Sequence, residues 1–152
     1  MSDNQFKSLL KDEYLHVSGV IESFDARVVT IKAWSISFSL AAMAAAFASH
    51  AKVILLVSAF SALLFWLIEG MWKTFQNAFY PRINEIEKYF RGESDEIKLM
   101  QANASWIKHW RNGGMRKLLQ IMFWPHVFLP HIVVFLCGVV LYILVLAGCL
   151  SI

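Results

Sequence analysis

Two opposite charges flank the first apolar hairpin of the sequence, and their positions could support chemistry inside a membrane. Lys32 precedes an uncharged run over residues 33–51, and Glu69 follows a second uncharged run over residues 53–68. A turn at His50–Ala51 places each charged residue roughly 28 Å from that turn along its own helix. Two antiparallel helices would therefore hold Lys32 and Glu69 at the same depth in the membrane.

Three interpretations of this pair are open from the sequence. The two side chains can extend separately toward the membrane surface, as long charged side chains near helix ends do. They can instead form an ion pair that fixes the register of the hairpin. Alternatively, Glu69 carboxylates from several copies can form a ring that lines a cation pathway. Lys32 and Glu69 are thus candidates for a structural ion pair or for a pore.

A second cluster combines basic and aromatic side chains. On one interpretation it is ordinary charge beside a membrane, where each basic residue near anionic lipid contributes about 1 kcal/mol. On the other, it is a cytoplasmic surface that receives an acidic ligand such as a nucleotide, or an acidic partner protein. The members of this expected ligand, lipid or partner surface are Trp106, Lys108, Trp110, Arg111, Arg116 and Lys117.

The sequence lacks the motifs of common enzyme active sites. It contains no HExxH, CxxC, GxSxG or glycine-rich phosphate loop. Its five histidines are scattered, and His126 and His131 are five positions apart, a poor spacing for two metal ligands on one regular helix. We therefore expect no enzymatic activity, no cofactor or metal, and no direct binding of duplex nucleic acid.

The composition indicates an integral membrane protein. Of the 152 residues, 58% are hydrophobic and 16% are charged, whereas soluble domains average roughly 45–50% and about 25%. A third uncharged run covers residues 118–152. Each run is long enough, or nearly so, to cross a hydrocarbon core of about 30 Å. We predict an all-α integral membrane protein with three transmembrane helices and a small cytoplasmic helical bundle.

The basic residues predict how these parts are oriented. Thirteen of the fourteen Lys and Arg residues lie before Ala33 or from Lys73 to Lys117, and Lys52 alone lies between the first two runs. Because basic loops favour the cytoplasmic side, we expect a multi-pass membrane protein with a cytoplasmic amino terminus and a carboxyl terminus on the opposite side of the membrane. The expected parts are a cytoplasmic amphipathic helix (1–30), a transmembrane hairpin (31–72), a cytoplasmic helical segment with an interfacial helix (73–126) and a third transmembrane helix (127–152).

Local signals predict helix boundaries outside the membrane. Pro81 should kink the chain or start a new helix. Ser94 can cap a following helix led by Asp95, and the Asn-Gly-Gly sequence at 112–114 should end that helix. An apolar stripe predicts that an amphipathic helix runs directly into the first span. The stripe consists of Leu10, Val17, Ile21, Phe24, Val28 and Ile31.

Small residues recur at helical spacing in the first span. Such a face lets another helix backbone approach closely, either within one chain or between chains. We expect a homo-oligomer in the lipid bilayer, and any conducting path would have to form between chains. The residues of this helix-packing face are Ser35, Ser39, Ala42, Ala46 and Ser49.

The pattern around the hairpin resembles a group of small bacterial proteins with two or three spans, similar to the SLATT-type effectors encoded beside phage-defence genes. The similarity covers roughly residues 27–91. It implies a bacterial inner-membrane effector, with its carboxyl terminus in the periplasm, that oligomerises and perturbs the membrane when triggered. The separate ligand-sensing domains common in that group are missing. The residues that carry the resemblance are Arg27, Lys32, Trp34, Leu64, Phe65, Trp66, Leu67 and Glu69.

Two functional hypotheses follow from the sequence. The first is an oligomeric inner-membrane effector or channel-like component of an anti-phage defence system, gated from the cytoplasm. The alternative is a non-conducting membrane anchor or sensor that recruits a soluble cytoplasmic protein or an acidic ligand.

Overall fold

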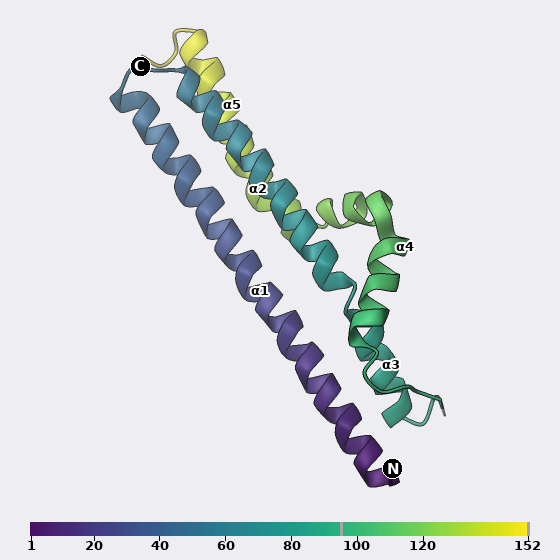
Figure 1. The fold of residues 1–152 in the computed structure, drawn as a ribbon. Helices are drawn as coiled ribbons and strands as arrows, with labels where there is room; N and C mark the ends of the chain where they lie inside the picture. The colour runs from purple at the N-terminus through teal and green to yellow at the C-terminus, as the bar shows by residue number, and fades with distance from the viewer. Residues whose placement is uncertain (95, 152) are drawn as a thin grey trace. The chain divides into compact units, whose positions relative to one another are not determined.

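The structure is a computed structural model that describes residues 1–94 and 96–151, so Asp95 and Ile152 lie outside the described residues. The described part of the chain is helical and contains no strand, which confirms the predicted all-α class. The helices are α1 (Asp3–Ala48), α2 (Val53–Asn77), α3 (Tyr80–Phe90), α4 (Ala102–Met122) and α5 (Pro125–Leu146) (Figure 1).

The chain divides into two compact units. The membrane unit contains Val28–Met71 and Leu119–Ile152, and the head unit contains Met1–Arg27 and Trp72–Leu118. Three helices, α1, α2 and α5, are each long and apolar enough to cross a membrane. The chain therefore has the architecture of a multi-pass membrane protein.

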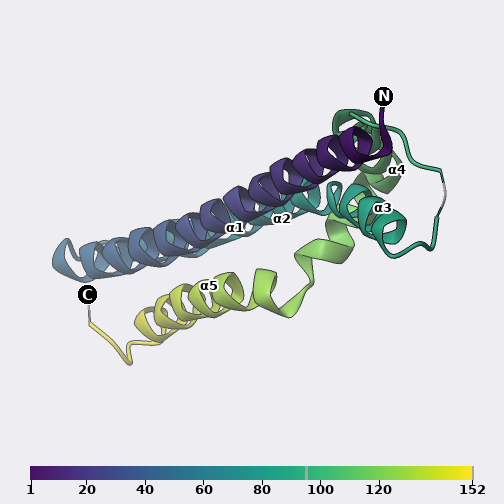
Figure 2. The ribbon, with the colours of Figure 1, turned by 90° about the horizontal axis from the view of Figure 1, so that it is seen from below.

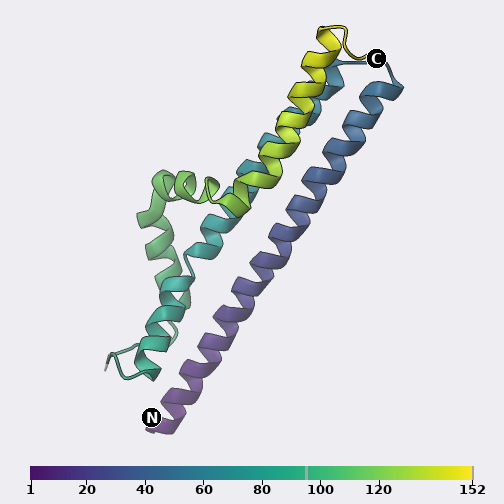
Figure 3. The same ribbon diagram turned by 180° about the vertical axis from the view of Figure 1, so that it is seen from behind.

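The membrane unit consists of the α1–α2 hairpin with α5 running alongside it (Figures 2 and 3). The hairpin turns at the predicted position, since α1 ends at Ala48, α2 begins at Val53, and His50 between them has a φ of 54°. Helix α5 approaches α2 closely at Gly138, where an added Cβ would lie 3.1 Å from the carbonyl oxygen of Leu55. A residue without a side chain is what allows this close packing of two backbones.

The membrane unit buries a small apolar core together with several polar side chains, and it exposes large apolar side chains. The buried apolar core consists of Met43, Ala46, Leu55, Ala62 and Val134. Ser35, Ser39 and Ser58 are also fully buried. Large apolar side chains cover the outside, as a lipid-facing surface requires. They include Phe38, Leu40, Leu56, Val57, Phe60, Leu64, Val133, Leu136 and Val140.

The head unit combines the start of α1, the end of α2, α3 and most of α4. The stripe predicted on α1 is buried here, with Leu10 and Val17 almost inaccessible. Helix α3 carries Pro81 in its first turn, where the missing N–H of proline costs no hydrogen bond. The predicted break in α4 also occurs, because Gly114 has a φ of 50° and a ψ of −156°. The predictions made from Pro81 and from the Asn-Gly-Gly sequence at 112–114 are therefore confirmed.

The predicted helix start near Ser94 is wrong. The described residues 96–101 are not helical, and α4 begins only at Ala102. Asp95, which was expected to lead the helix, lies outside the described residues. The Ser94 hydroxyl donates instead to the Glu96 carbonyl oxygen at 3.3 Å, so it caps no helix.

Helix α4 starts late because a side chain of another helix, Glu13 of α1, binds the segment before it. The Glu13 carboxylate of α1 accepts the backbone N–H groups of Met100 and Gln101 at 2.9 and 3.0 Å. The Arg82 guanidinium of α3 donates to the Lys98 carbonyl oxygen at 2.7 Å. These tertiary hydrogen bonds hold the connecting segment in place and outweigh the local capping signal.

Candidate functional site

The structure brings Lys32 and Glu69 together inside the membrane unit. Lys32 Nζ lies 2.9 Å from Glu69 Oε1, and the Glu69 side chain is fully buried while that of Lys32 is 24% exposed. The contact has the distance of an ion pair but not the direction of a hydrogen bond, so Oε1 accepts no hydrogen bond from the described residues. Lys32 can thus keep its ammonium near the surface while its charge compensates the carboxylate.

His131 of α5 is the second partner of Glu69. Its Nε2 lies 2.9 Å from Glu69 Oε2, and its Nδ1 lies 2.9 Å from the hydroxyl oxygen of Ser35. His131 is only 1% exposed and Ser35 is fully buried. One carboxylate on α2 therefore contacts both a lysine on α1 and a histidine on α5. The histidine in turn contacts α1 through a hydrogen bond with Ser35.

The chemistry of an ionised carboxylate fixes the direction of these bonds. A carboxylate only accepts hydrogen bonds, so His131 donates through its Nε2–H to Glu69. In neutral imidazole, Nδ1 then accepts the Ser35 hydroxyl proton, whereas in imidazolium Nδ1–H donates to the Ser35 oxygen. Both forms of His131 are satisfied by the same two partners.

The grouping of serine, histidine and glutamate does not form an accessible catalytic site. Ser35 and Glu69 are fully buried, and His131 is nearly so. A serine nucleophile must reach a substrate carbonyl, which this burial prevents. Within the described residues, no group of three His, Cys, Asp or Glu side chains is placed to hold a metal ion. The arrangement is suited to joining helices.

Most of the small face on α1 is used for packing within the chain. The Ser58 hydroxyl of α2 donates to the Ser39 carbonyl oxygen at 3.0 Å, and the Ser39 and Ser61 hydroxyls lie 3.3 Å apart. Ala46 is fully buried in the apolar core. Ala42 is half-buried and Ser49 is exposed, and the Ser49 hydroxyl bonds back to the Ala45 carbonyl oxygen.

The burial of these side chains within one chain affects two predictions made from the sequence, the Glu69 pore and the small helix-packing face. A ring of Glu69 carboxylates around a pore requires the side chain to face other copies, but Glu69 is fully buried within its own chain. The small face was expected to serve contacts within or between chains, and Ser35, Ser39 and Ala46 are occupied within one chain. The ion pair interpretation of Lys32 and Glu69 fits the geometry best.

A second buried charge network lies in the head unit. Arg82 is fully buried and binds the Glu13 carboxylate through two nitrogens, Nε at 3.0 Å and Nη2 at 2.8 Å. Its Nη1 also lies 2.9 Å from Glu85. Such a two-pronged contact is the strong form of an arginine–carboxylate pair. It ties α1 to α3 at the segment that leads into α4.

The surroundings of Glu13 keep its carboxylate ionised. Burial alone would raise the pKa of Glu13, but the hydrogen bonds and charge of Arg82 outweigh burial, and the N–H groups of Met100 and Gln101 add to them. The net effect is a lowered pKa of Glu13. Burial would likewise lower the pKa of Arg82, whereas Glu13 and Glu85 raise it. The pair therefore stays charged at neutral pH.

The two tryptophans of the predicted basic and aromatic surface stack on each other. The rings of Trp106 and Trp110 are 5.4 Å apart and within 10° of parallel. Trp106 Nε1 donates to the Phe75 carbonyl oxygen at 2.9 Å, and both tryptophans also contact the Phe75 ring. Trp106 is thus a structural contact between α2 and α4, while Trp110 is 41% exposed.

The basic residues of that surface are not gathered at one point. Arg111 and Arg116 are exposed, whereas Lys117 is half-buried. Lys108 borders a cavity of about 820 Å³ between α3, α4 and the segment before α4. Lys117 borders a smaller cavity of about 170 Å³ together with Trp110. The sequence did not predict that Lys108 and Lys117 line two different cavities.

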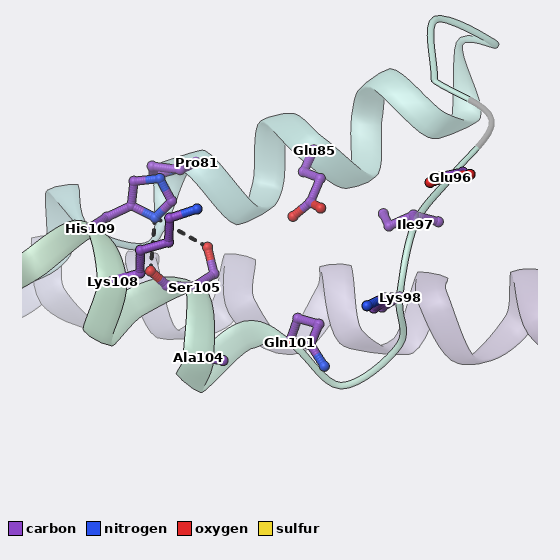
Figure 4. Close-up of a pocket in the computed structure, with 10 residues that line it drawn as sticks. All are labelled: Pro81, Glu85, Glu96, Ile97, Lys98, Gln101, Ala104, Ser105, Lys108 and His109. Carbon is purple, nitrogen blue, oxygen red and sulfur yellow. Dashed lines mark hydrogen bonds between the residues drawn. The ribbon is translucent and has the colours of Figure 1, made fainter.

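The larger cavity carries both signs of charge. Figure 4 shows Glu85 of α3 and Gln101 facing the space, with Lys108 and His109 of α4 at its other end. His109 Nδ1 lies 2.8 Å from the Ser105 carbonyl oxygen, so this nitrogen carries a proton and Nε2 remains for another partner. An open, charged cavity suits a polar segment of a soluble molecule better than an apolar ligand.

Several residues of these networks were not expected to form a site. His131 was regarded as one of five scattered histidines, although an ionisable residue inside an apolar run is itself a signal. Glu13 lies on the same helical face as Leu10 and Val17, which indicates a buried carboxylate that needs a partner. Arg82 is likewise adjacent to the apolar positions of α3. These interruptions of apolar stripes were the available signals.

Comparison of the chain with protein-family models, with curated proteins and with solved structures finds no match.

Proposed function

We propose that the chain is a non-conducting membrane anchor or sensor whose head unit binds a soluble partner. The observation that carries this proposal is the direction of the polar side chains in the membrane unit. Glu69, His131, Ser35 and Ser39 are buried within one chain, while large apolar side chains such as those of Phe38, Leu56 and Val133 are exposed on the membrane-spanning helices. Helices that present apolar side chains to their surroundings are suited to lipid and poorly suited to lining an aqueous path.

The partner is acidic at its point of contact with α4. After Glu96 the sequence contains no further Asp or Glu, but it contains Lys98, Lys108, Arg111, Arg116 and Lys117. Two of these lysines, Lys98 and Lys108, border the cavity of about 820 Å³. Charge of one sign on an exposed helix steers partners of opposite charge. The cavity offers such a partner a place to insert a side chain.

The orientation that places the head unit in the cytoplasm of an inner membrane belongs to the same proposal. It is supported by the basic residues, which concentrate in the head unit. Single cysteines at Lys52 and at Arg91, in a chain with Cys137 and Cys149 replaced by serine, test it. A membrane-impermeant thiol reagent should label the Lys52→Cys variant in intact cells and spare Arg91→Cys. Labelling of Arg91→Cys would reverse the orientation.

Expression in cells with a potential-sensitive dye tests the anchor function. The wild-type chain should leave the membrane potential at the level of an empty vector, because Glu69, His131 and Ser35 are buried within one chain. The Lys108→Glu variant, which reverses charge at the large cavity, should do the same. Depolarisation by the wild-type chain would contradict the anchor function.

An oligomeric effector of an anti-phage defence system is the second candidate function. The specific observation in its favour is the contact among three ionisable groups of the membrane unit, Lys32, Glu69 and His131. A plain anchor needs only apolar helices, and ionisable residues in membrane segments are costly to keep. Rearrangement of the three helices in an oligomer would expose these groups. Depolarisation that is lost on Glu69→Gln would favour this candidate over the anchor.

A further inference from the structure

A second, smaller cavity lies at the junction of α2, α3 and α4 in the head unit. Its volume is about 170 Å³, enough space for about five or six water molecules in the liquid. Its lining mixes an aromatic wall with polar and basic groups, unlike the apolar core nearby. The polar and aromatic lining residues are Thr74, Asn77, His109, Trp110 and Lys117.

The charge that lines this cavity is positive, and no Asp or Glu of the described residues lines it. Lys117 is half-buried, and no acidic side chain of the described residues lies within ion-pair distance of its ammonium. A half-buried lysine without a counter-ion favours a bound anion.

Two residues that line the cavity lie close in sequence to the membrane unit. Thr74 lies three residues after Met71, at which the membrane unit ends, and Lys117 lies two residues before Leu119, at which it resumes. The cavity is therefore built from residues next to two crossings into the membrane unit. Trp110 also presents 41% of its surface, and tryptophan rings are favoured at the level of lipid headgroups.

We propose that this cavity binds the phosphate group of an anionic phospholipid. Lys117 supplies the positive charge, the Asn77 amide donates a hydrogen bond, and the Trp110 ring covers the glycerol portion. The inference goes beyond the proposed partner site, because it assigns a second ligand to a different cavity. It rests on the chain being in a membrane, and not on whether the chain conducts ions.

Two variants separate a specific cavity from diffuse attraction between the basic head unit and lipid. Asn77→Leu fills the cavity and removes an amide without changing charge. Arg116→Gln removes one charge from an exposed residue that does not line the cavity. Specific binding predicts a large effect of the first and a small effect of the second. Diffuse charge predicts the reverse.

The measurement is lipid retention by the full-length protein, determined by native mass spectrometry after release from nanodiscs. Nanodiscs of phosphatidylcholine with increasing phosphatidylglycerol give the apparent affinity for the anionic lipid. We expect Lys117→Gln to weaken this affinity about fivefold, the factor equivalent to about 1 kcal/mol for one basic residue. Asn77→Leu should weaken it by a similar factor, and Arg116→Gln by less than about twofold.

The same spectra identify the source of the phosphate. Inorganic phosphate added to protein in pure phosphatidylcholine should not remain bound, since it lacks the glycerol portion that Trp110 covers. Retained inorganic phosphate without retained phosphatidylglycerol would overturn the lipid assignment. Equal effects of Arg116→Gln and Lys117→Gln, with none from Asn77→Leu, would overturn the cavity itself. Circular dichroism of each variant establishes that the helices are intact before the comparison is made.

Discussion

Glu69 of α2 and His131 of α5 lie 2.9 Å apart, carboxylate Oε2 to imidazole Nε2, and both side chains are excluded from the surface of the membrane unit. The other carboxylate oxygen of Glu69 contacts Lys32 of α1. A glutamate at the end of an apolar run is thus explained by two partners on two other helices. The contacts fix the relative register of three helices that otherwise pack through small and apolar side chains.

The pairing of Lys32 with Glu69 predicts non-additive effects on stability. Glu69→Gln leaves Lys32 without its counter-ion, and Lys32→Met leaves a buried carboxylate with only His131. The double variant removes both charges and should lose less stability than the two single losses added together. We expect a coupling free energy of about 1–3 kcal/mol, measured from unfolding in a detergent titration.

His131→Gln serves as the control for this cycle, since a glutamine amide can still donate to Glu69 while it cannot reach Ser35 as the imidazole does. It should leave the coupling between Lys32 and Glu69 in place. Strict additivity of Lys32→Met and Glu69→Gln would show that the two charges do not interact.

Enlarging the small face of α1 should destabilise the single chain. Ala46 is fully buried in the core of the membrane unit, so Ala46→Leu would overpack it at a cost of about 1–3 kcal/mol. Ala41 lies on the exposed side of the same helix, and Ala41→Leu should have little effect. Thermal unfolding of both variants in detergent distinguishes the two positions. Equal effects would mean that the face is not buried within one chain.

Gly138 should tolerate no side chain, because an added Cβ would lie 3.1 Å from both the Leu55 carbonyl oxygen and the Ala59 Cβ. Gly138→Ala would force α5 away from α2 at a cost of about 1–3 kcal/mol. Gly19 is the matched control, since nothing lies within 4 Å of its added Cβ. Gly19→Ala should stabilise α1 by about 0.5–1 kcal/mol. The difference in unfolding midpoint between the two variants checks the helix contact.

The buried pair of Glu13 and Arg82 should hold the segment before α4 in one conformation. Arg82→Met leaves the Glu13 carboxylate buried without its counter-ion, and we expect a loss of about 3–5 kcal/mol. The amides of Met100 and Gln101 should then exchange faster with deuterium, because the cap that holds them is lost. Unchanged exchange at these two amides would show that Glu13 does not position α4.

Acid should destabilise the wild-type chain, as Arg82→Met does, because it protonates Glu13. The pKa of Glu13 is lowered in the folded protein, since Arg82 and two backbone N–H groups outweigh burial. Its stabilisation is therefore complete above about pH 4.3, the ordinary value for glutamate, and is lost as pH falls through the lowered value. Glu13→Gln removes this titration, so the variant should show a weaker loss of stability with acid.

The sequence was sufficient to predict features that depend on local composition. Uncharged runs predicted the three apolar helices, and the equal distances of Lys32 and Glu69 from the hairpin turn brought them to one depth. Pro81 and Gly114 predicted a helix start and a helix break because each residue has a strong intrinsic backbone preference. Periodicity along α1 predicted its buried stripe for the same local reason.

Features that depend on how distant helices pack against each other could not be predicted from the sequence. The contact of His131 with Glu69 depends on where α5 packs against the hairpin, which no spacing in the sequence specifies. The start of α4 was misplaced because Glu13, more than eighty positions earlier, supplies its cap. Ser94 carried a valid local signal that a stronger tertiary arrangement overrode.

Ion flux from liposomes that contain the purified wild-type chain tests most directly the claim that its polar groups are consumed within one chain. The fluorescence change of a trapped ion indicator should match that in protein-free liposomes. Glu69→Gln and Ala41→Leu should give the same background. Flux from the wild-type chain that Glu69→Gln abolishes and Ala41→Leu preserves would contradict the burial of Glu69 within one chain, because it would place Glu69 on a conducting path.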